Sequence, residues 1–189
     1  MNMKKILFFL VAILTATMMN VNAAERGKFI HVDASVNKNL KPQLAFLQEH
    51  KGGKDVTTLL VKTVSANNFY EFTDASRVLV RFADGTAIRL PRVAGSDVQK
   101  NKFSKKNGNA TIQFCETITT YETTPEMISK LESNIAIIKV RIVFKENDAK
   151  DYDIEAGYQA KMAADLLKSY QETAQKNKQS NGDLSDDDF

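Results

Sequence analysis

The segment 77–92, RVLVRFADGTAIRLPR, constrains the fold of this chain more than any other part of the sequence. Its Asp-Gly pair separates two runs of alternating apolar residues, which is typical of a β-hairpin. A two-residue turn would pair Val80 with Arg89 and would put charge on both faces of the hairpin. A three-residue loop at 83–85 instead pairs Val80 with Ile88 and keeps the apolar side chains on one face. The segment therefore predicts an antiparallel hairpin whose loop ends in a glycine with left-handed backbone conformation.

The same segment contains four of the six arginines in the chain. The predicted register puts Arg77, Arg81 and Arg89 together on the outward face. Arg92 falls just beyond the second strand, because Pro91 cannot donate a ladder hydrogen bond. A guanidinium group is planar and forked, and it suits carboxylates and phosphates, so Arg77, Arg81 and Arg89 are our candidate ligand-binding residues. The alternative is that acidic neighbours neutralise them, namely Glu71, Asp74 or Glu116.

Other segments have the composition or the alternation of β-strands. The run 135–144, IAIIKVRIVF, is the most hydrophobic of them, so we expect it in the centre of the sheet. The polar segment 93–109 carries four lysines and is expected to be a mobile, solvated connection. Further strands are predicted at 27–33, 55–64, 67–72 and 110–123.

Three segments predict helices. In the segment 37–53, Pro42 suits a first helical turn and three apolar residues form a stripe, which indicates a short helix. Thr124 is expected to cap a second short helix that starts at Pro125. The segment 153–176 has the period of an amphipathic helix. Its apolar stripe consists of Ile154, Tyr158, Met162, Leu166 and Tyr170, thickened by Ala163 and Leu167.

Together these segments predict an α+β fold with a single domain over residues 25–176. Its mostly antiparallel sheet would have about six or seven strands. The C-terminal amphipathic helix and one or two short helices would cover one face of that sheet. The tail 177–189 has almost no apolar content and is expected to be disordered.

Residues 1–24 have the pattern of a cleaved signal peptide. Lys4 and Lys5 precede an uncharged apolar run at 6–16, which is shorter than the roughly 20 residues that a membrane span needs. We expect the mature chain to begin at Ala24 or Glu25, to have no membrane span, and to be exported to the periplasm or the extracellular space.

The charge of that mature chain is nearly balanced. Loss of Lys4 and Lys5 reduces 26 basic residues to 24, against 23 acidic ones. A duplex-binding domain is normally basic, so nucleic acid is not an expected partner. The sequence has no glycine-rich phosphate loop, no HExxH and no CxxC pair, so we predict no cofactor and no metal site.

No catalytic residue is assigned from the sequence. His31 and His50 fall on different predicted elements, and neither has a nucleophile close to it in the sequence. Cys115 is the only cysteine, which precludes an internal disulfide, and no thiol-nucleophile signature surrounds it. The acidic segment 145–155 lacks the spacing of a calcium loop, and its carboxylates are better explained by the start of the following helix.

Three runs and the closing helix resemble a group of small exported proteins, uncharacterised in activity, of Bacteroidetes-type Gram-negative bacteria. The runs are SRVLVRFADGTAIRL, ITTYETTPEMISKL and IAIIKVRIVF, and the resemblance covers about residues 67–176. It implies an exported α+β domain. It carries no functional residue over to this chain, because the shared motifs are structural.

These observations lead us to expect a non-enzymatic binding or accessory module. It would recognise another envelope or secreted protein, or an anionic ligand, through the face that carries the three arginines. One alternative is a small secreted hydrolase that uses carboxylates or Cys115. Another is a structural subunit of a cell-envelope assembly.

Overall fold

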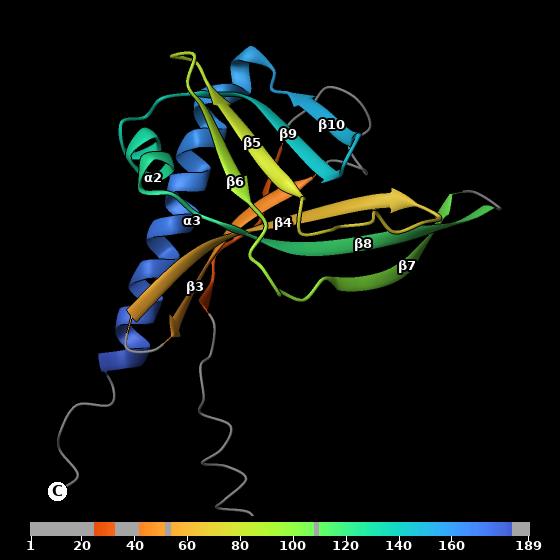
Figure 1. The fold of residues 1–189 in the computed structure, drawn as a ribbon, viewed down its shortest axis with the longest axis horizontal. Coiled ribbons are helices and arrows are strands. Elements are labelled where there is room, and N and C mark those ends of the chain that lie inside the picture. The colour runs from red at the N-terminus through yellow and green to blue at the C-terminus, as the bar shows by residue number, and fades with distance from the viewer. Residues whose placement is uncertain (1–24, 33–41, 52–53, 108–109, 183–189) are drawn as a thin grey trace, which may run out of the picture.

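A computed structural model describes residues 25–32, 42–51, 54–107 and 110–182, and in these residues it shows two antiparallel sheets and two helices (Figure 1). The predicted α+β class is confirmed, although the strands are more numerous than expected and form two sheets. The strands are β1 (Glu25–Arg26), β2 (Ile30–His31), β3 (Gln43–Lys51), β4 (Lys54–Ala66), β5 (Arg77–Phe82), β6 (Ala87–Pro91), β7 (Gln99–Asn107), β8 (Ala110–Glu122), β9 (Ile137–Lys145) and β10 (Asp148–Asp153). The helices are α2 (Pro125–Glu132) and α3 (Ala156–Gly182).

The four-stranded sheet has the order β10-β9-β5-β6 and contains the predicted hairpin. Val80 lies opposite Ile88 on one side and opposite Val140 on the other. Gly85 ends the loop with a φ of 88°, in the left-handed region that favours glycine. The three-residue loop and its register are therefore confirmed, and β9 lies inside the sheet as its hydrophobicity predicts.

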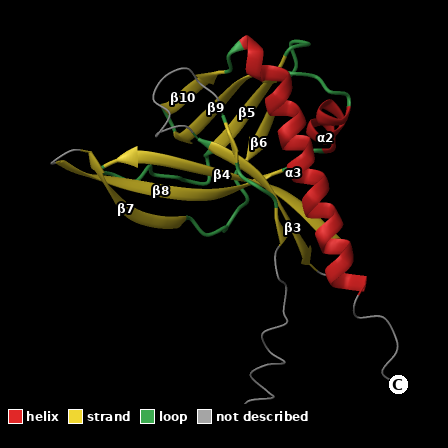
Figure 2. Cartoon of the chain, turned by 180° about the vertical axis from the view of Figure 1, so that it is seen from behind, coloured by secondary structure: helices red, strands yellow, loops and turns green. Residues whose placement is uncertain are grey.

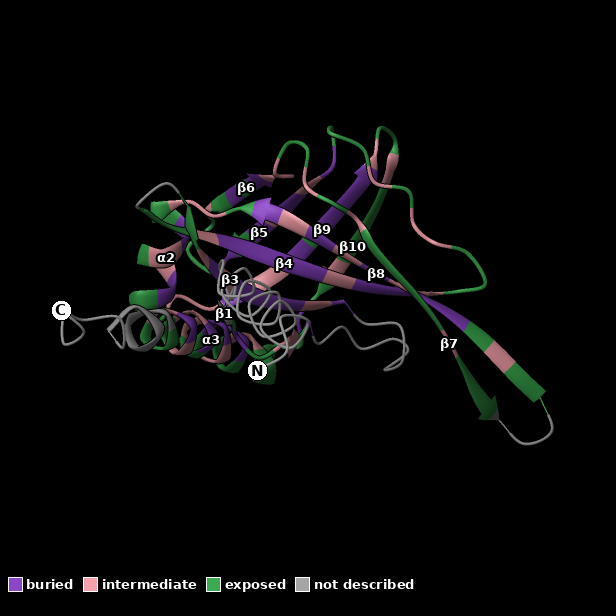
Figure 3. Cartoon of the chain, turned by 90° about the horizontal axis from the view of Figure 1, so that it is seen from below, coloured by how far each residue is buried: buried purple, intermediate pink, exposed green. Residues whose placement is uncertain are grey.

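The six-stranded sheet has the order β1-β3-β4-β8-β7, and β2 also pairs with β3. Its long central strands β4 and β8 have 13 residues each. They run beyond the body of the molecule and carry β7 outward with them (Figures 1 and 3). We call this projecting part, formed by β7 and the adjoining ends of β4 and β8, the wing.

The two sheets join where the chain leaves β6. Arg92 forms a β-bridge with Tyr121 of β8, and the amide of Val93 donates a hydrogen bond to the carbonyl of Thr120 at 3.0 Å. The chain that leaves β6 thus runs directly alongside β8 and connects the two sheets. Their inner faces therefore enclose one common core. Its fully buried members include Phe46, Leu59, Phe82, Leu90, Val140, Ile142 and Phe144.

Helix α3 closes the open side of this core and lies in front of the sheets in Figure 2. Met162, Ala163 and Leu166 are buried as the apolar stripe predicts, and the ring of Tyr170 meets the ring of Phe46 edge-on at 5.4 Å. Tyr158, which was expected in the stripe, is 45% exposed because it lies in the first turn of α3, beyond the edge of the core.

A serine of α3 also completes the edge of the six-stranded sheet. The amide of Phe46 donates to the hydroxyl of Ser169 at 3.4 Å, and this hydroxyl donates to the carbonyl of Lys28 at 3.2 Å. The backbone of Gly27 passes so close that a Cβ placed there would lie 2.3 Å from the Ser169 hydroxyl oxygen. The interruption between β1 and β2 is therefore bridged by a side chain of the helix.

Helix α2 begins as predicted. The amide of Met127 donates to the hydroxyl of Thr124 at 3.2 Å, and Pro125 occupies the first turn. Met127 and Leu131 point into the core and are fully buried. This agreement follows from local chemistry, because the capping hydroxyl and the proline act within one turn.

The helix predicted in 37–53 is wrong. Residues 43–51 form strand β3, which pairs with β4 over its whole length. Leu44 and Phe46 face the core, and Ala45 is fully buried on the opposite face. A strand covered on both faces loses its alternating pattern, and its apolar residues then imitate a helical stripe.

Three further expectations differ from the structure. The segment 93–109 was expected to be a loop but contains β7, and the acidic segment before α3 forms β10. Residues 67–72 form no strand, although Tyr70 stacks on Phe144 with ring centroids 4.1 Å apart.

The predicted boundaries of the chain are tested only in part by the described residues. Helix α3 continues to Gly182, six residues into the segment that was expected to be disordered. The predicted signal peptide at 1–24 and residues 183–189 lie outside the described part of the chain.

Candidate functional site

The outward face of the four-stranded sheet carries five basic side chains, which we call the arginine face. They are Arg77, Arg81 and Arg89 of the hairpin together with Lys139 and Arg141 of β9. The inward alternation of Val78, Val80 and Phe82 forces the intervening residues of β5 outward. The three arginines that the sequence singles out therefore lie on one face, as predicted.

The register arranges these cations in rows across the strands. One row of neighbouring residues crosses the four strands and consists of Arg89, Leu79, Arg141 and, at its end in β10, Asp151. Arg81 and Lys139 are neighbours in the next row, which ends at Asp153. Adjacent rows on one face of a sheet are about 6.8 Å apart, and adjacent strands about 4.8 Å, so the cations form a regular, flat array.

The two aspartates of β10 neutralise only one half of this array. Lys139 Nζ lies 2.9 Å from an oxygen of Asp153, and Arg141 Nε lies 3.4 Å from an oxygen of Asp151. Among the described residues, Arg81 and Arg89 form no ion pair and are exposed. The half formed by β5 and β6 therefore keeps its positive charge, while the half formed by β9 and β10 is balanced.

The carboxylates that could have neutralised the arginines are engaged elsewhere. Glu71 pairs with Lys145, whose ammonium group holds the pKa of that carboxyl below its usual value. Glu116 lies 3.7 Å from Lys62. Asp74 binds the guanidinium group of Arg92 at 2.9 Å.

Arg92 consequently has a structural role that separates it from the other three. Its side chain is only 9% exposed, and it donates to the carbonyl of Ser96 as well as to Asp74. These contacts hold the segment between β6 and β7 in place against the loop that precedes β5. Of the four clustered arginines, three lie on the arginine face and one holds two loops together.

The histidines and the cysteine that a thiol hydrolase would need are not brought together. His31 of β2 and Cys115 of β8 are separated by β3 and β4, which corresponds to at least about 14 Å across the sheet. Cys115 is buried, with 1% exposure. His50 lies at the far end of β3, where its Nδ1 is 2.9 Å from an oxygen of Asp55.

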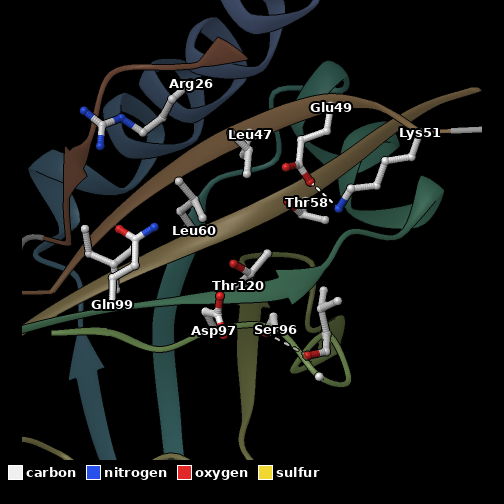
Figure 4. Close-up of a pocket in the computed structure, with 13 residues that line it drawn as sticks. Arg26, Leu47, Glu49, Lys51, Thr58, Leu60, Ser96, Asp97, Gln99 and Thr120 are labelled. Atoms are coloured by element: carbon white, nitrogen blue, oxygen red, sulfur yellow. Dashed lines mark hydrogen bonds and ion pairs between the residues drawn. The ribbon is translucent and has the colours of Figure 1, made fainter. Parts of the chain in front are cut away.

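A groove on the outer face of the six-stranded sheet is a second candidate site (Figure 4). It encloses about 740 Å³, and Leu47, Leu60 and Ile118 form its apolar floor. Thr58, also in the floor, is 6% exposed, and its hydroxyl has no hydrogen-bond partner among the described residues. Strand β1, strands β3, β4, β8 and β7, and the segment 93–97 all contribute to this groove.

The charges that line the groove are balanced, unlike those of the arginine face. Arg26 and Lys51 are matched by Glu49 and Asp97, and Glu49 is paired with Lys51 at 2.6 Å. Neither histidine nor Cys115 lies in its lining. The groove therefore offers hydrogen bonds to a polar molecule, and its lining holds two carboxylates, Glu49 and Asp97, but no histidine or cysteine.

Two further features are absent from the described residues. They contain no group of three or more histidine, cysteine, aspartate or glutamate side chains that is placed to hold a metal ion. They also contain no helix with both the length and the apolar character needed to cross a membrane.

Sequence reasoning found three of the five cations on the arginine face and missed two. Lys139 and Arg141 lie within the run that was identified as a buried central strand, and the apolar neighbours concealed their common outward direction. Their alternation with Ile138, Val140 and Ile142 was the available signal. The groove had no such signal, because its lining comes from six separate segments.

No family model matches this sequence, and comparisons with curated proteins and with solved structures return no significant match.

Proposed function

We propose that this protein is a non-enzymatic binding module of the cell envelope or the secreted fraction, and that its arginine face recognises an anionic ligand or an acidic protein surface. The observation that carries this proposal is that, among the described residues, no carboxylate pairs with the arginines in the half of the face formed by β5 and β6. There Arg81 and Arg89 are exposed on neighbouring strands and form no ion pair among the described residues. Charges that serve only solubility are normally mixed in sign, whereas these are of one sign and in one plane.

The chemistry of the face favours oxyanions. A guanidinium group binds a carboxylate, phosphate or sulfate through two parallel hydrogen bonds, and this geometry requires a rigid base. The base here is a sheet whose inner side is sealed by fully buried side chains, including Val78, Val80 and Val140. Such a surface suits a polyanion or an acidic patch, because a flat array offers several separate oxyanion contacts and no enclosed pocket.

The main alternative is a hydrolase, and the geometry favours the binding module over it. The exposed arginines lie on an open sheet face, while Cys115 is buried and distant from both histidines. A structural subunit of an envelope assembly would be a special case of protein binding through the same face.

The direct test is charge reversal within the uncompensated half. The variant Arg81→Glu/Arg89→Glu should elute from immobilised heparin, a sulfated polyanion, at lower salt than wild type, and should lose any partner that wild-type protein captures from envelope extracts. The matched control is Lys54→Glu/Lys176→Glu, which changes net charge by the same amount at two exposed lysines away from the four-stranded sheet.

Folding must be unaffected for the test to be decisive. Both arginines point outward without an ion pair, so the thermal midpoint of the variant should stay within a few degrees of wild type, about the range of surface substitutions. Equal heparin retention by the two double variants would reject the proposal, because net charge alone would then explain the binding.

A further inference from the structure

Strand β7 presents an unpaired backbone edge at the outer side of the wing. It pairs with β8 over nine residues on one side only, and it is the last strand in the order of the six-stranded sheet. Lys100, Lys102, Ser104, Lys105 and Lys106 are all exposed, so no described segment covers them. Alternate residues of an antiparallel edge strand direct their N–H and C=O groups away from the sheet, where an added strand can bond to them.

The edge is basic along its whole length. Lys100, Lys102, Lys105 and Lys106 form no ion pair with another described residue. The ammonium groups of Lys100 and Lys102 lie 5.5 and 5.6 Å from the centre of the Phe69 ring, and that of Lys105 lies 5.9 Å from the centre of the Phe103 ring. The rings hold these cations near the strand without cancelling their charge. We call β7 with its four lysines the lysine edge.

Lysines on an edge strand select what can pair with it. Two copies of β7 placed side by side would bring eight lysines together, so pairing of this edge with itself is strongly disfavoured. A neutral strand would leave the ammonium groups without partners. An extended segment with acidic residues at alternate positions would satisfy the backbone and place carboxylates beside Lys100 and Lys102, which share one face of the sheet.

The sequence itself contains two stretches with acidic residues at alternate positions. In one of them, Asp151 and Asp153 already pair with Arg141 and Lys139; the other lies at 183–189. Residues 183–189 read DLSDDDF, with four aspartates for the four lysines of β7. Asp186 and Asp188 are two residues apart, which is the spacing of neighbours on one face of a strand. In an extended segment Phe189 would point to the opposite face from Asp186 and Asp188. In β7, Phe103 likewise points to the opposite face from Lys100 and Lys102.

We propose that the lysine edge binds the acidic segment 183–189 of a second copy of this chain, as a strand added to the six-stranded sheet. Helix α3 ends at Gly182 on the side of β3, at the opposite end of the molecule from the wing (Figures 1, 2 and 3). Strand β4, which has 13 residues, runs about 40 Å from the β3 side to the wing, whereas seven residues span at most about 25 Å even when fully extended. The segment of one copy therefore reaches the wing of a neighbour, and the copies associate head to tail.

The arginine face is the competing receptor for the same segment. Its strands β5 and β9 are bonded on both sides, so they can offer an acidic segment side chains but no backbone partners. Strand β6 ends the sheet, but it has only five residues, ends in Pro91 and carries one cation, Arg89. Asp151 and Asp153 also occupy one end of it. The lysine edge offers charge and backbone together, and this is why we assign the segment to β7.

Two measurements on the purified full chain test this inference. Sedimentation velocity follows self-association at low and at high salt. Fluorescence anisotropy follows binding of a labelled peptide, NGDLSDDDF, which corresponds to residues 181–189. Deletion of 183–189 should shift the protein to monomer, and high salt should weaken the association. Lys102→Glu/Lys105→Glu should weaken both association and peptide binding by at least about tenfold, whereas Lys54→Glu/Lys176→Glu should change them little.

Two controls separate strand addition from general charge attraction. A charge swap that combines Lys100→Glu/Lys102→Glu with Asp186→Lys/Asp188→Lys should restore self-association. A peptide of the same sequence with N-methyl groups on alternate amides keeps every carboxylate but cannot complete the backbone ladder, so it should not bind.

The results that would overturn the inference differ from those that bear on the proposed function. A protein that stays monomeric at every concentration and does not bind the peptide rejects it. Loss of peptide binding in Arg81→Glu/Arg89→Glu, with binding retained in Lys102→Glu/Lys105→Glu, assigns the segment to the arginine face and rejects the lysine edge. Equal binding of the N-methylated peptide rejects strand addition.

Discussion

The arginine face and the lysine edge are both basic, but they lie on differently supported parts of the molecule. The arginine face covers a sheet whose inner side chains are fully buried and whose central strands are bonded on both sides. The lysine edge belongs to the wing, where β7 has a neighbour on one side only. The two proposed sites would therefore use similar charge in two ways, one through side chains on a rigid plane and one through an open main chain.

The largest expected effect comes from removing the support beneath each surface. Phe144 is fully buried behind the arginine face, where it stacks on Tyr70 and meets Phe72 edge-on at 5.4 Å. Phe144→Ala should lower the free energy of unfolding by about 3–5 kcal/mol. Phe103 of the wing is only partly buried and stacks on Phe114 at 5.4 Å, so Phe103→Ala should cost about 1 kcal/mol.

Chemical denaturation of the two variants checks this difference. Equal losses of stability would contradict the proposed difference in support, because the wing would then be as firmly packed as the four-stranded sheet. The Phe103→Ala variant should also keep heparin retention, since it leaves the arginine face intact.

A smaller change, this time an increase in the free energy of unfolding, is expected for substitutions where the six-stranded sheet leads into the wing. Thr63 and Thr117 lie opposite each other on its inner face, 2% and 0% exposed, and neither hydroxyl has a hydrogen-bond partner among the described residues. An unsatisfied buried hydroxyl is costly, so Thr63→Val/Thr117→Val should raise the free energy of unfolding by about 1–2 kcal/mol.

Thr119 provides the matched control for this prediction. It is equally buried, but its hydroxyl donates to the carbonyl of Val61 at 3.4 Å, so Thr119→Val should not be stabilising. If substitution by valine changes the thermal midpoint equally at all three threonines, the unpaired hydroxyls are not what weakens this part of the sheet.

The smallest effect concerns the turn at the end of the arginine face. The hydrogen bond from Lys130, with a second one from the amide of Thr86, lowers the pKa of Asp84 from its usual 3.8 to about 2. A carboxyl with a lowered pKa stabilises the fold above the pKa of the unfolded chain, and this contribution is lost as pH falls from about 4 towards 2. Asp84→Asn should therefore be slightly less stable than wild type at neutral pH.

Thermal unfolding between pH 7 and pH 2 tests the assignment. The difference between wild type and Asp84→Asn should shrink through this acidic range and vanish near pH 2. A difference that is independent of pH would mean that the Lys130 contact contributes nothing, because asparagine retains the oxygen that accepts from Thr86.

The elements that could be predicted from the sequence are those whose determinants are local. The hairpin of β5 and β6 follows from its turn chemistry and alternation, and α2 follows from Thr124 and Pro125. Strand β3 could not be predicted in this way, because burial on both faces removes the alternation. Strand β7 has a single apolar residue inside it, Phe103, and it is a strand because β8 offers it a long edge.

The same distinction explains the candidate site. Arg77, Arg81 and Arg89 were found because one hairpin register places all three. Lys139 and Arg141 join them only through the pairing of β5 with β9, which connects residues about 60 positions apart, and no local pattern specifies that pairing.

The hydroxyl of Ser169 has a consequence for the order in which this protein can be completed. The bonds that it forms to Phe46 and Lys28 connect residues 123 and 141 positions apart in the chain. The first strands of the sheet thus depend on a helix that follows all of them in the chain. Until α3 has docked, the N-terminal edge lacks these two hydrogen bonds, so this edge is completed only after α3 has been synthesised.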